Sequence, residues 1–200
     1  MQLSPRHCQS ACAVFLDRDG TLIRDQHYAF RPERIELLEG VVKGLLVLQG
    51  AGYRLVVVTN QSGVARGYFG EADVVAMHRH LDALLRSQGV RVDGYYYCPH
   101  HPEGVVSGYT VACECRKPRP GLIYRARADV GIDLRRSWLV GDALSDVLAG
   151  RAAGCRTILL AVDDERHHDA APTHVAQSLR EAADIIVASD VAAQPTARQA

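Results

Sequence analysis

Short apolar runs alternate with longer amphipathic segments along most of this 200-residue chain. The apolar runs, which predict buried strands, are Ala13–Leu16, Leu55–Val58, Gly94–Tyr97, Trp138–Val140 and Thr157–Leu160. The amphipathic segments, which predict helices, are Val41–Gln49, Glu71–Gln88, Pro120–Val130 and Ser145–Ala153. Such alternation is typical of βαβ units, so it predicts an α/β fold around a mainly parallel sheet. One more strand is predicted at Asp184–Val187, on an edge of the sheet.

Length and composition indicate a single domain over residues 1–190, followed by a flexible tail at 191–200. Basic and acidic residues number 23 each, and this balance argues against nucleic acid or an acidic membrane as a partner. No segment approaches the roughly 18 consecutive apolar residues of a membrane helix. The first twelve residues also lack the pattern of a secretory signal. We therefore expect a cytoplasmic protein, and a monomer because no strongly apolar surface helix stands out.

Residues with chemically useful side chains come directly after successive predicted strands. They are Asp17, Thr59, Cys98 and Asp142. Ligands of open α/β sheets bind outside the carboxyl ends of the strands. We therefore expect these four residues to share one rim, although they are far apart in the sequence.

The first motif is Asp17–Thr21 (DRDGT). Two carboxylates this close repel one another unless a cation or a shared proton relieves them, and Mg²⁺ suits such a site because it prefers oxygen ligands. In isolation, an ordinary Asp-Gly surface turn explains the motif equally well. A calcium loop is excluded, because Leu22 and Tyr28 stand where that loop requires a glycine and a bidentate glutamate.

Three further motifs each have a chemical and a commonplace explanation. Thr59–Gly63 (TNQSG) offers hydroxyl, amide and backbone donors to a phosphoryl oxygen, but such residues also form turns. Arg116–Pro118 (RKP) offers positive charge for a phosphoryl transition state, but most lysines are solvated. In Gly141–Asp146, Asp142 is a second candidate magnesium ligand, and Asp146 is either a supporting partner or a helix N-terminal acid.

A cysteine-rich segment at 98–115 predicts a second metal site. Three sulfurs and one imidazole, from Cys98, His100, Cys113 and Cys115, match a closed tetrahedral zinc site with a structural role. His101 could replace His100, and the spacing alone leaves this open. The alternative is a set of free thiols near a loop.

In this order the four motifs resemble the signature of the haloacid dehalogenase (HAD) superfamily. The resemblance implies a Rossmann-like, three-layer α/β/α fold and a phosphatase. It implies that Asp17 is the nucleophile and that Asp19 is the general acid and base. Thr59 and Lys117 would stabilise the transferring phosphoryl group. The carboxylates of Asp17 and Asp142 and the backbone carbonyl of Asp19 would hold Mg²⁺.

The stretches FLDRDGT, VVVTNQSGVARGYF, YYYCPHHP and CECRKPRPG further resemble the D-glycero-D-manno-heptose 1,7-bisphosphate 7-phosphatase family. Those enzymes serve the synthesis of ADP-heptose or GDP-heptose for lipopolysaccharide and other surface polysaccharides. The resemblance implies a small sugar bisphosphate as substrate. Its implied contacts are Asp25, Gln26, His27, Tyr28, Thr59, Asn60, Gln61, Ser62, Arg116 and Lys117. Arg116 suits the distal phosphate, which a guanidinium can grip through two hydrogen bonds.

Two positions depart from the family pattern. Ala143 stands where a lysine is familiar, and His27 where a glycine is familiar. Ala143 leaves the predicted magnesium ligand Asp142 intact. Its effect would be on the exact position of the loop that carries Asp142, and on the preference for the α or β anomer of the substrate. The spaces between the motifs are filled by predicted helices and strands, so we expect no cap domain over the site.

Three other functions compete with this interpretation. A histidinol-phosphate phosphatase would share the four motifs and the zinc loop. A phosphatase of nucleic-acid ends would require a basic surface, which the balanced charge does not favour. A non-catalytic phosphate-binding scaffold would not need Asp17, Asp19 and Asp142, and all three are present. His167 and His168 lie in a polar segment and are expected to be solvated.

Overall fold

The structure is a computed structural model, and it describes residues 11–25, 35–161 and 171–193. The strands are β1 (Ala13–Leu16), β2 (Arg54–Asn60), β3 (Gly94–Cys98), β4 (Trp138–Gly141), β5 (Arg156–Leu160) and β6 (His174–Ala176). The α-helices are α1 (Val41–Gly50), α2 (Glu71–Ser87), α3 (Gly121–Val130), α4 (Leu144–Ala153) and α5 (Leu179–Ala193). A short 3₁₀ turn, η2 (Leu134–Arg136), precedes β4.

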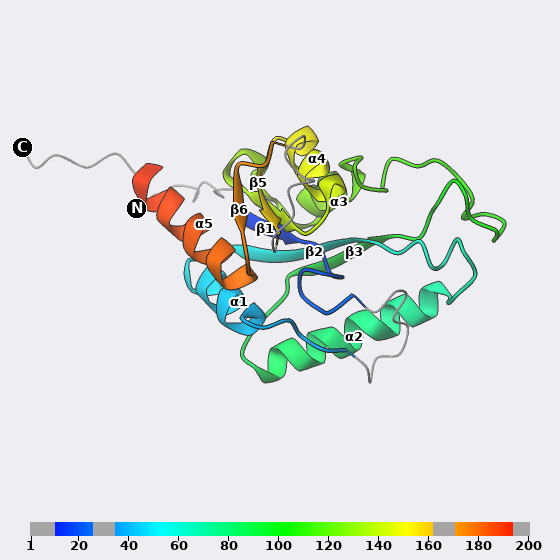
Figure 1. Cartoon of the computed structure of the whole chain (residues 1–200), viewed down its shortest axis with the longest axis horizontal. Coiled ribbons are helices and arrows are strands. Elements are labelled where there is room, and N and C mark those ends of the chain that lie inside the picture. Colours follow the sequence, from blue (N-terminus) through cyan, green and yellow to red (C-terminus); the bar gives the residue numbers. More distant parts are fainter. Residues whose placement is uncertain (1–10, 26–34, 162–170, 194–200) are drawn as a thin grey trace, which may run out of the picture.

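The strands form one parallel sheet in the order β3-β2-β1-β4-β5-β6. β1 lies in the interior, with Leu16 beside Val57 of β2 on one side and Val140 of β4 on the other. All carboxyl ends therefore lie along one edge of the twisted sheet, and Figure 1 shows β2 and β3 running to the right toward that edge. The predicted α/β fold with a parallel sheet is confirmed.

Alternate residues of the strands enter two separate cores, as the period of a strand requires. Val14 and Leu16 of β1 pack with α1, α2 and α5 on one face, whereas Ala13 and Phe15 pack with α3 and α4 on the other. Figure 1 shows these helix layers on either side of the sheet. Because strands covered on both faces are apolar throughout, β1 is a continuous apolar run rather than an alternating one.

The predicted edge strand at Asp184–Val187 is wrong. These residues lie within α5, and the edge strand is β6. The residues of α5 that enter the core are Leu179, Ala182, Ala183 and Ile186, which is the spacing of a helix face. The β-branched residues at 185–187 suggested a strand, but packing of this face against the sheet and α1 outweighs that local preference.

Within the described residues no cap domain is inserted between the strands that carry the motifs. The chain from β1 to β2 contains α1, and the chain from β2 to β3 contains α2. The described helices also include none that is both long and apolar enough to span a bilayer. Of the predicted flexible tail, Val191–Ala193 ends α5, and the remainder lies outside the described residues.

The helical register of α5 can be tested with a pair of substitutions on that helix. Ile186 is fully buried, so Ile186→Ala should lower the free energy of unfolding by about 2–5 kcal/mol. Asp184→Ala, on the exposed side of the same helix, should change it by less than about 0.5 kcal/mol. Urea denaturation measures both, and equal losses would contradict this register.

Candidate active site

The residues predicted after the strands meet at the carboxyl edge of the sheet. Asp17 follows β1, Thr59 lies near the end of β2, and Asp142 follows β4. Because β2 and β4 flank β1, these three strand ends are neighbours. The structure therefore brings Asp17, Thr59 and Asp142 together, and Lys117 reaches the same place from a later loop.

The ammonium group of Lys117 lies at the centre of the site and is almost completely buried. It donates to Asp17 Oδ1 at 2.7 Å and to the carbonyl oxygen of Val58 at 2.8 Å, and it lies 2.5 Å from Asp146 Oδ1. Burial opposes its charge, but the carboxylates of Asp146 and Asp17 outweigh burial and hold the pKa of Lys117 above its ordinary value. The lysine is therefore a fixed positive charge against the predicted nucleophile.

Asn60, at the end of β2, holds the backbone of Lys117 in place. Its amide Nδ2 donates to the carbonyl oxygen of Lys117 at 3.1 Å, and its Oδ1 accepts from the N–H of Lys117 at 3.0 Å. These two bonds fasten the irregular loop that follows the cysteines to a buried strand. A substrate contact of Asn60 stays a prediction.

Three carboxylates surround the position where a cation would bind. One oxygen of each of Asp17, Asp142 and Asp146 lies within 4.8 Å of the others. Asp146 is already engaged, since its Oδ2 accepts from the N–H of Ala143 at 3.1 Å and its Oδ1 faces Lys117. Asp17 and Asp142 are thus the carboxylates available to a metal ion, and oxygen donors of this kind fit Mg²⁺.

Gly20 permits the close approach of the two acidic loops. Its φ is +76°, and a Cβ at this position would lie 2.1 Å from Asp142 Oδ2. Any other residue would displace the carboxylate of Asp142. Thr21, the next residue, donates from Oγ1 to Asp142 Oδ1 at 3.3 Å, which fixes the orientation of that carboxylate.

The electrostatics of the acidic group call for a cation. Burial raises the pKa of the Asp17 carboxyl to about 7, although Lys117 acts in the opposite direction. Burial, with the nearby Asp146 charge, raises the pKa of the Asp142 carboxyl to about 6. A divalent cation would stabilise both ionised carboxylates, and the predicted role of Asp17 as a nucleophile requires the ionised form.

A second network, which the sequence interpretation missed, surrounds the carboxylate of Asp19. Arg18 is only 2% exposed, and its guanidinium donates to both oxygens of Asp19. Gln61, only 4% exposed, donates to Asp19 Oδ2 at 2.9 Å and to Thr59 Oγ1 at 2.8 Å. The signal available in the sequence was an arginine between two aspartates, directly after a buried strand.

Two arginines lie beside the histidine pair at the end of β3. Arg116 donates to the carbonyl oxygen of His100 at 3.3 Å, and Arg66 Nη2 lies 3.3 Å from His101 Nε2. Neither guanidinium pairs with a carboxylate of the described residues. Within this part of the chain, no carboxylate offsets their positive charge. The sequence interpretation included Arg116 and missed Arg66, which lies in the loop that follows the TNQS segment.

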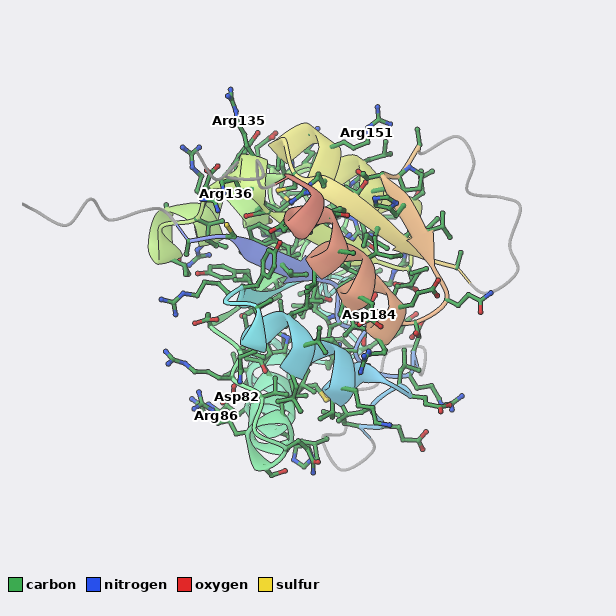
Figure 2. All side chains as sticks on the ribbon, turned by 90° about the vertical axis from the view of Figure 1, so that its left-hand side faces the viewer. Asp82, Arg86, Arg135, Arg136, Arg151 and Asp184 are labelled. Atoms are coloured by element: carbon green, nitrogen blue, oxygen red, sulfur yellow. The ribbon has the colours of Figure 1, made fainter. Side chains whose placement is uncertain are left out.

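Other arginines lie at the opposite edge of the sheet. Figure 2 views that edge, where Arg135, Arg136 and Arg151 project from the surface. Arg135 and Arg136 end η2 and precede β4, so they belong to the amino edge. Their charge is thus separate from that of Arg66 and Arg116.

The predicted zinc ligands form a compact cluster. The three sulfur atoms of Cys98, Cys113 and Cys115 lie 3.1–3.5 Å apart, and His100 Nδ1 lies 3.3 Å from Cys115 Sγ and 3.7 Å from Cys98 Sγ. A disulfide would require about 2.0 Å. Tetrahedral coordination at a Zn–S distance of about 2.3 Å places sulfurs roughly 3.8 Å apart, somewhat farther than here. Three cysteines and one histidine gathered this closely are a donor set that fits a zinc ion.

His100, not His101, joins the three cysteines. His101 Nδ1 accepts from the N–H of Glu103 at 3.1 Å, and its other ring nitrogen faces Arg66. The cluster is also braced from outside, because Tyr109 of the same loop donates to Glu71 at the start of α2 at 2.7 Å. The choice between the two histidines that the spacing left open thus falls on His100.

Known proteins resemble this chain over most of its length. A family model described as HAD-hydrolase-like matches residues 114–182. The D-glycero-β-D-manno-heptose-1,7-bisphosphate 7-phosphatase of Haemophilus ducreyi is 48% identical over 149 residues, which are 74% of this chain and 81% of that protein. The enzyme of the same name from Yersinia pestis is 42% identical over 152 residues, which are 76% of this chain and 81% of that protein.

The chain belongs to this phosphatase family of the HAD superfamily. It is therefore a phosphoric monoester hydrolase. Solved structures agree with this assignment. A HAD-like phosphatase from Mesorhizobium loti aligns with a TM-score of 0.80 and 34% identity, over 94% of this chain and 90% of that one. The D,D-heptose 1,7-bisphosphate phosphatase of B. bronchiseptica, complexed with magnesium and phosphate, aligns with a TM-score of 0.77 and 32% identity. The alignment covers 89% of this chain and 99% of that one.

For several predicted residues, the structure gives either no position or only backbone contacts. Gln26, His27 and Tyr28 lie outside the described residues, as do His167 and His168, whereas Asp25 ends the first described range. Ser62 is half-buried, and its carbonyl oxygen accepts from the N–H of Arg66 at 3.0 Å. Ala143 is extended and immediately precedes α4. Contacts between these residues and a substrate stay predictions.

The raised pKa values predict how Mg²⁺ binding depends on pH. Both values exceed the 3.9 or so of an aspartate in an unfolded chain, so without Mg²⁺ the fold loses stability as pH rises from about 4 to about 7. Mg²⁺ at this site would bind the ionised carboxylates and would compete with protons at low pH. It should therefore raise the melting temperature more at about pH 8 than at about pH 5, as measured by scanning fluorimetry.

The control for this experiment is a carboxylate at the other edge of the sheet. Asp142→Asn should lose most of the Mg²⁺-dependent rise, because it removes one of the two available carboxylates. Asp93→Asn, which breaks the ion pair with Arg54 before β3, should keep the rise. An equal rise at both pH values would contradict the prediction.

Proposed function

We propose that the chain removes the 7-phosphate of D-glycero-D-manno-heptose 1,7-bisphosphate in a Mg²⁺-dependent reaction through an aspartyl-phosphate intermediate. The observation that carries the chemistry is the buried contact of Lys117 with Asp17, 2.7 Å long, at the carboxyl edge of the sheet. The names of relatives 42–48% identical support the substrate, and those names specify the β anomer. The product would serve ADP-heptose synthesis for lipopolysaccharide.

The reaction has two steps. In the first, a carboxylate oxygen of Asp17 attacks phosphorus, the bond from phosphorus to the sugar oxygen breaks, and Asp19 gives that oxygen a proton. In the second, Asp19 takes a proton from water, the water oxygen attacks phosphorus, and the bond to Asp17 breaks. Inorganic phosphate leaves, and both aspartates regain their initial states.

Fixed charges and donors would stabilise the transferring phosphoryl group. Lys117 supplies a positive charge that needs no rearrangement, because its three contacts already hold it. Thr59 Oγ1 accepts a hydrogen bond from Gln61, which leaves the threonine proton to be donated to a phosphoryl oxygen. Mg²⁺, held by Asp17, Asp142 and the Asp19 carbonyl, would offset the remaining negative charge when bound.

Arg116, with Arg66 nearby, would bind the distal phosphate at C1. Arg116 directly precedes Lys117, so the loop that stabilises the reacting phosphate also carries the predicted contact for the other one. Two guanidinium groups without a carboxylate partner among the described residues suit a phosphate dianion. A monophosphate would leave this charge without a partner, which favours a bisphosphate over histidinol phosphate.

Zinc would hold this loop in place through Cys98, His100, Cys113 and Cys115. Four protein ligands leave no open position for water, so its role would be structural. Cys115 directly precedes Arg116 and Lys117, and the coordinated sulfur would therefore fix the start of the RK segment. Without a metal ion, burial holds the pKa of the Cys98 thiol above its ordinary value, whereas zinc ligation requires a thiolate.

The substrate proposal is tested by comparing kcat/KM for three compounds. We expect the β anomer of heptose 1,7-bisphosphate to exceed the α anomer and to exceed histidinol phosphate by at least about 100-fold, the scale of losing one buried charged contact. A preference for histidinol phosphate would refute the heptose assignment, and a preference for the α anomer would redirect it to GDP-heptose. Asp17→Asn should abolish turnover of all three, because it removes the nucleophile.

The zinc proposal predicts about one zinc ion per chain by elemental analysis of protein purified without chelator. Cys115→Ser should lower that content and lower kcat, because the loop carrying Lys117 loses its anchor. Cys155 is a buried free thiol in the core between the sheet and α4, so Cys155→Ser is the matched control. This variant should retain both its zinc content and its kcat per folded protein. Full activity in zinc-free protein would refute the role assigned to zinc.

A further inference from the structure

We propose that Arg18 is a positioning residue which, together with Gln61, holds the carboxylate of Asp19 in the orientation that proton transfer requires. This inference rests on the proposed role of Asp19 as general acid and base. It adds two residues to that role, one of which lies inside the DRDGT motif between the two catalytic aspartates. Neither residue would touch the reacting atoms in order to act in this way.

The contacts of Arg18 define both the place and the plane of the Asp19 carboxylate. Arg18 Nε and Nη2 donate to Asp19 Oδ1 at 3.2 and 3.0 Å, and Nη2 also donates to Oδ2 at 2.9 Å. The side chain of Arg18 is 3% exposed, whereas that of Asp19 is 28% exposed. The guanidinium is thus buried, and part of the Asp19 side chain remains accessible to solvent.

The backbone around the pair is fixed as well. The carbonyl oxygen of Arg18 accepts from the N–H groups of Leu22 and Ile23 at 2.9 and 3.0 Å, and the N–H of Gly20 donates to the carbonyl oxygen of Ile23 at 2.8 Å. These bonds close a tight turn that sets the Cα position of Asp19. They leave its side-chain torsions free, and the bidentate contact with Arg18 removes that freedom.

Gln61 links this pair to the residue that would bind the phosphoryl group. Its amide nitrogen donates to Asp19 Oδ2 at 2.9 Å and to Thr59 Oγ1 at 2.8 Å, and its amide oxygen accepts from Arg18 Nη2 at 2.9 Å. A single planar amide therefore spans the proposed acid and the proposed phosphoryl ligand. The position of Asp19 relative to the phosphoryl group is set by this amide and by Arg18.

Stability alone does not account for an arginine at this position. A buried ion pair is often no more stabilising than apolar residues of similar volume, because both charges lose hydration. The guanidinium of Arg18 is buried, and its hydrogen bonds go to Asp19 and Gln61. What a guanidinium offers, and an apolar residue does not, is a fixed orientation for the carboxylate.

The decisive experiment compares two classes of phosphate ester in Arg18→Met. An alkyl phosphate needs a proton on its leaving oxygen, whereas p-nitrophenolate departs without one. We expect kcat/KM for the best alkyl phosphate substrate to fall by about 10–100-fold, and kcat/KM for p-nitrophenyl phosphate by less than about 3-fold. An equal fall for both esters, or no fall, would overturn the proposal, because a purely structural role affects both alike.

A double-mutant cycle then tests whether Arg18 acts through Asp19. In the Asp19→Asn background, Arg18→Met should produce little further loss of kcat/KM for the alkyl phosphate. Losses that multiply would overturn the proposal. Arg18→Lys keeps the charge but not the two-pronged contact, so it should recover only part of the alkyl phosphate activity.

Two further variants guard against misfolding. If Arg18→Met does not fold, Gln61→Met carries the same comparison of esters, because it removes the amide that links Asp19 to Thr59. Arg156→Met removes an ion pair to Asp190 and a contact 4.0 Å over the ring of Trp138, at the amino end of β5. This control should lose stability without any difference between the two esters.

Failure of this proposal is distinguishable from failure of the proposed function. If heptose 1,7-bisphosphate is not a substrate, the substrate assignment fails, but the comparison of alkyl and aryl esters still tests Arg18. If heptose 1,7-bisphosphate is the preferred substrate and Arg18→Met reduces both esters equally, the function stands and the positioning role does not.

Discussion

The site depends on one buried lysine. Lys117 is held among Asp17, Asp146 and the carbonyl oxygen of Val58, all within 2.8 Å of its ammonium group. Removing one partner of such a group leaves an uncompensated buried charge, which is far more costly than the net gain from the intact set. The lysine and its two carboxylates are therefore one unit. This unit ties β1, β2 and α4 to a loop that has no regular structure of its own.

The parallel sheet explains how that unit can form from residues so far apart in the chain. A strand order that places β1 between β2 and β4 brings the residue after β1 next to the ends of both neighbours. The loop with Arg116 and Lys117 does not itself arise at a strand end. It is also the element with a cysteine cluster and the bonds to Asn60, which replace the constraint that a strand would supply.

Strand-end positions could be predicted from periodicity and topology, whereas Lys117 and the cysteine cluster were predicted from residue type and family resemblance. Arg18 was passed over because a charged residue in a polar motif is expected to face solvent, and its burial depends on how Gln61 packs from β2. The assignment of Asp184–Val187 failed for a related reason. Its β-branched residues favour a strand locally, and only the packing of α5 on the sheet and α1 selects the helix.

The groups that orient the carboxylates of the site are in place without any ligand. An enzyme with a cap can order its acid and base when the cap closes, whereas the described residues here include no such domain. Order that exists before substrate binds requires groups whose positions do not depend on the ligand. Buried Arg18 and Gln61 meet that requirement for Asp19, and buried Lys117 meets it for Asp17. The side chains that remain more exposed, among them Ser62 and Arg116, are left to distinguish one sugar phosphate from another.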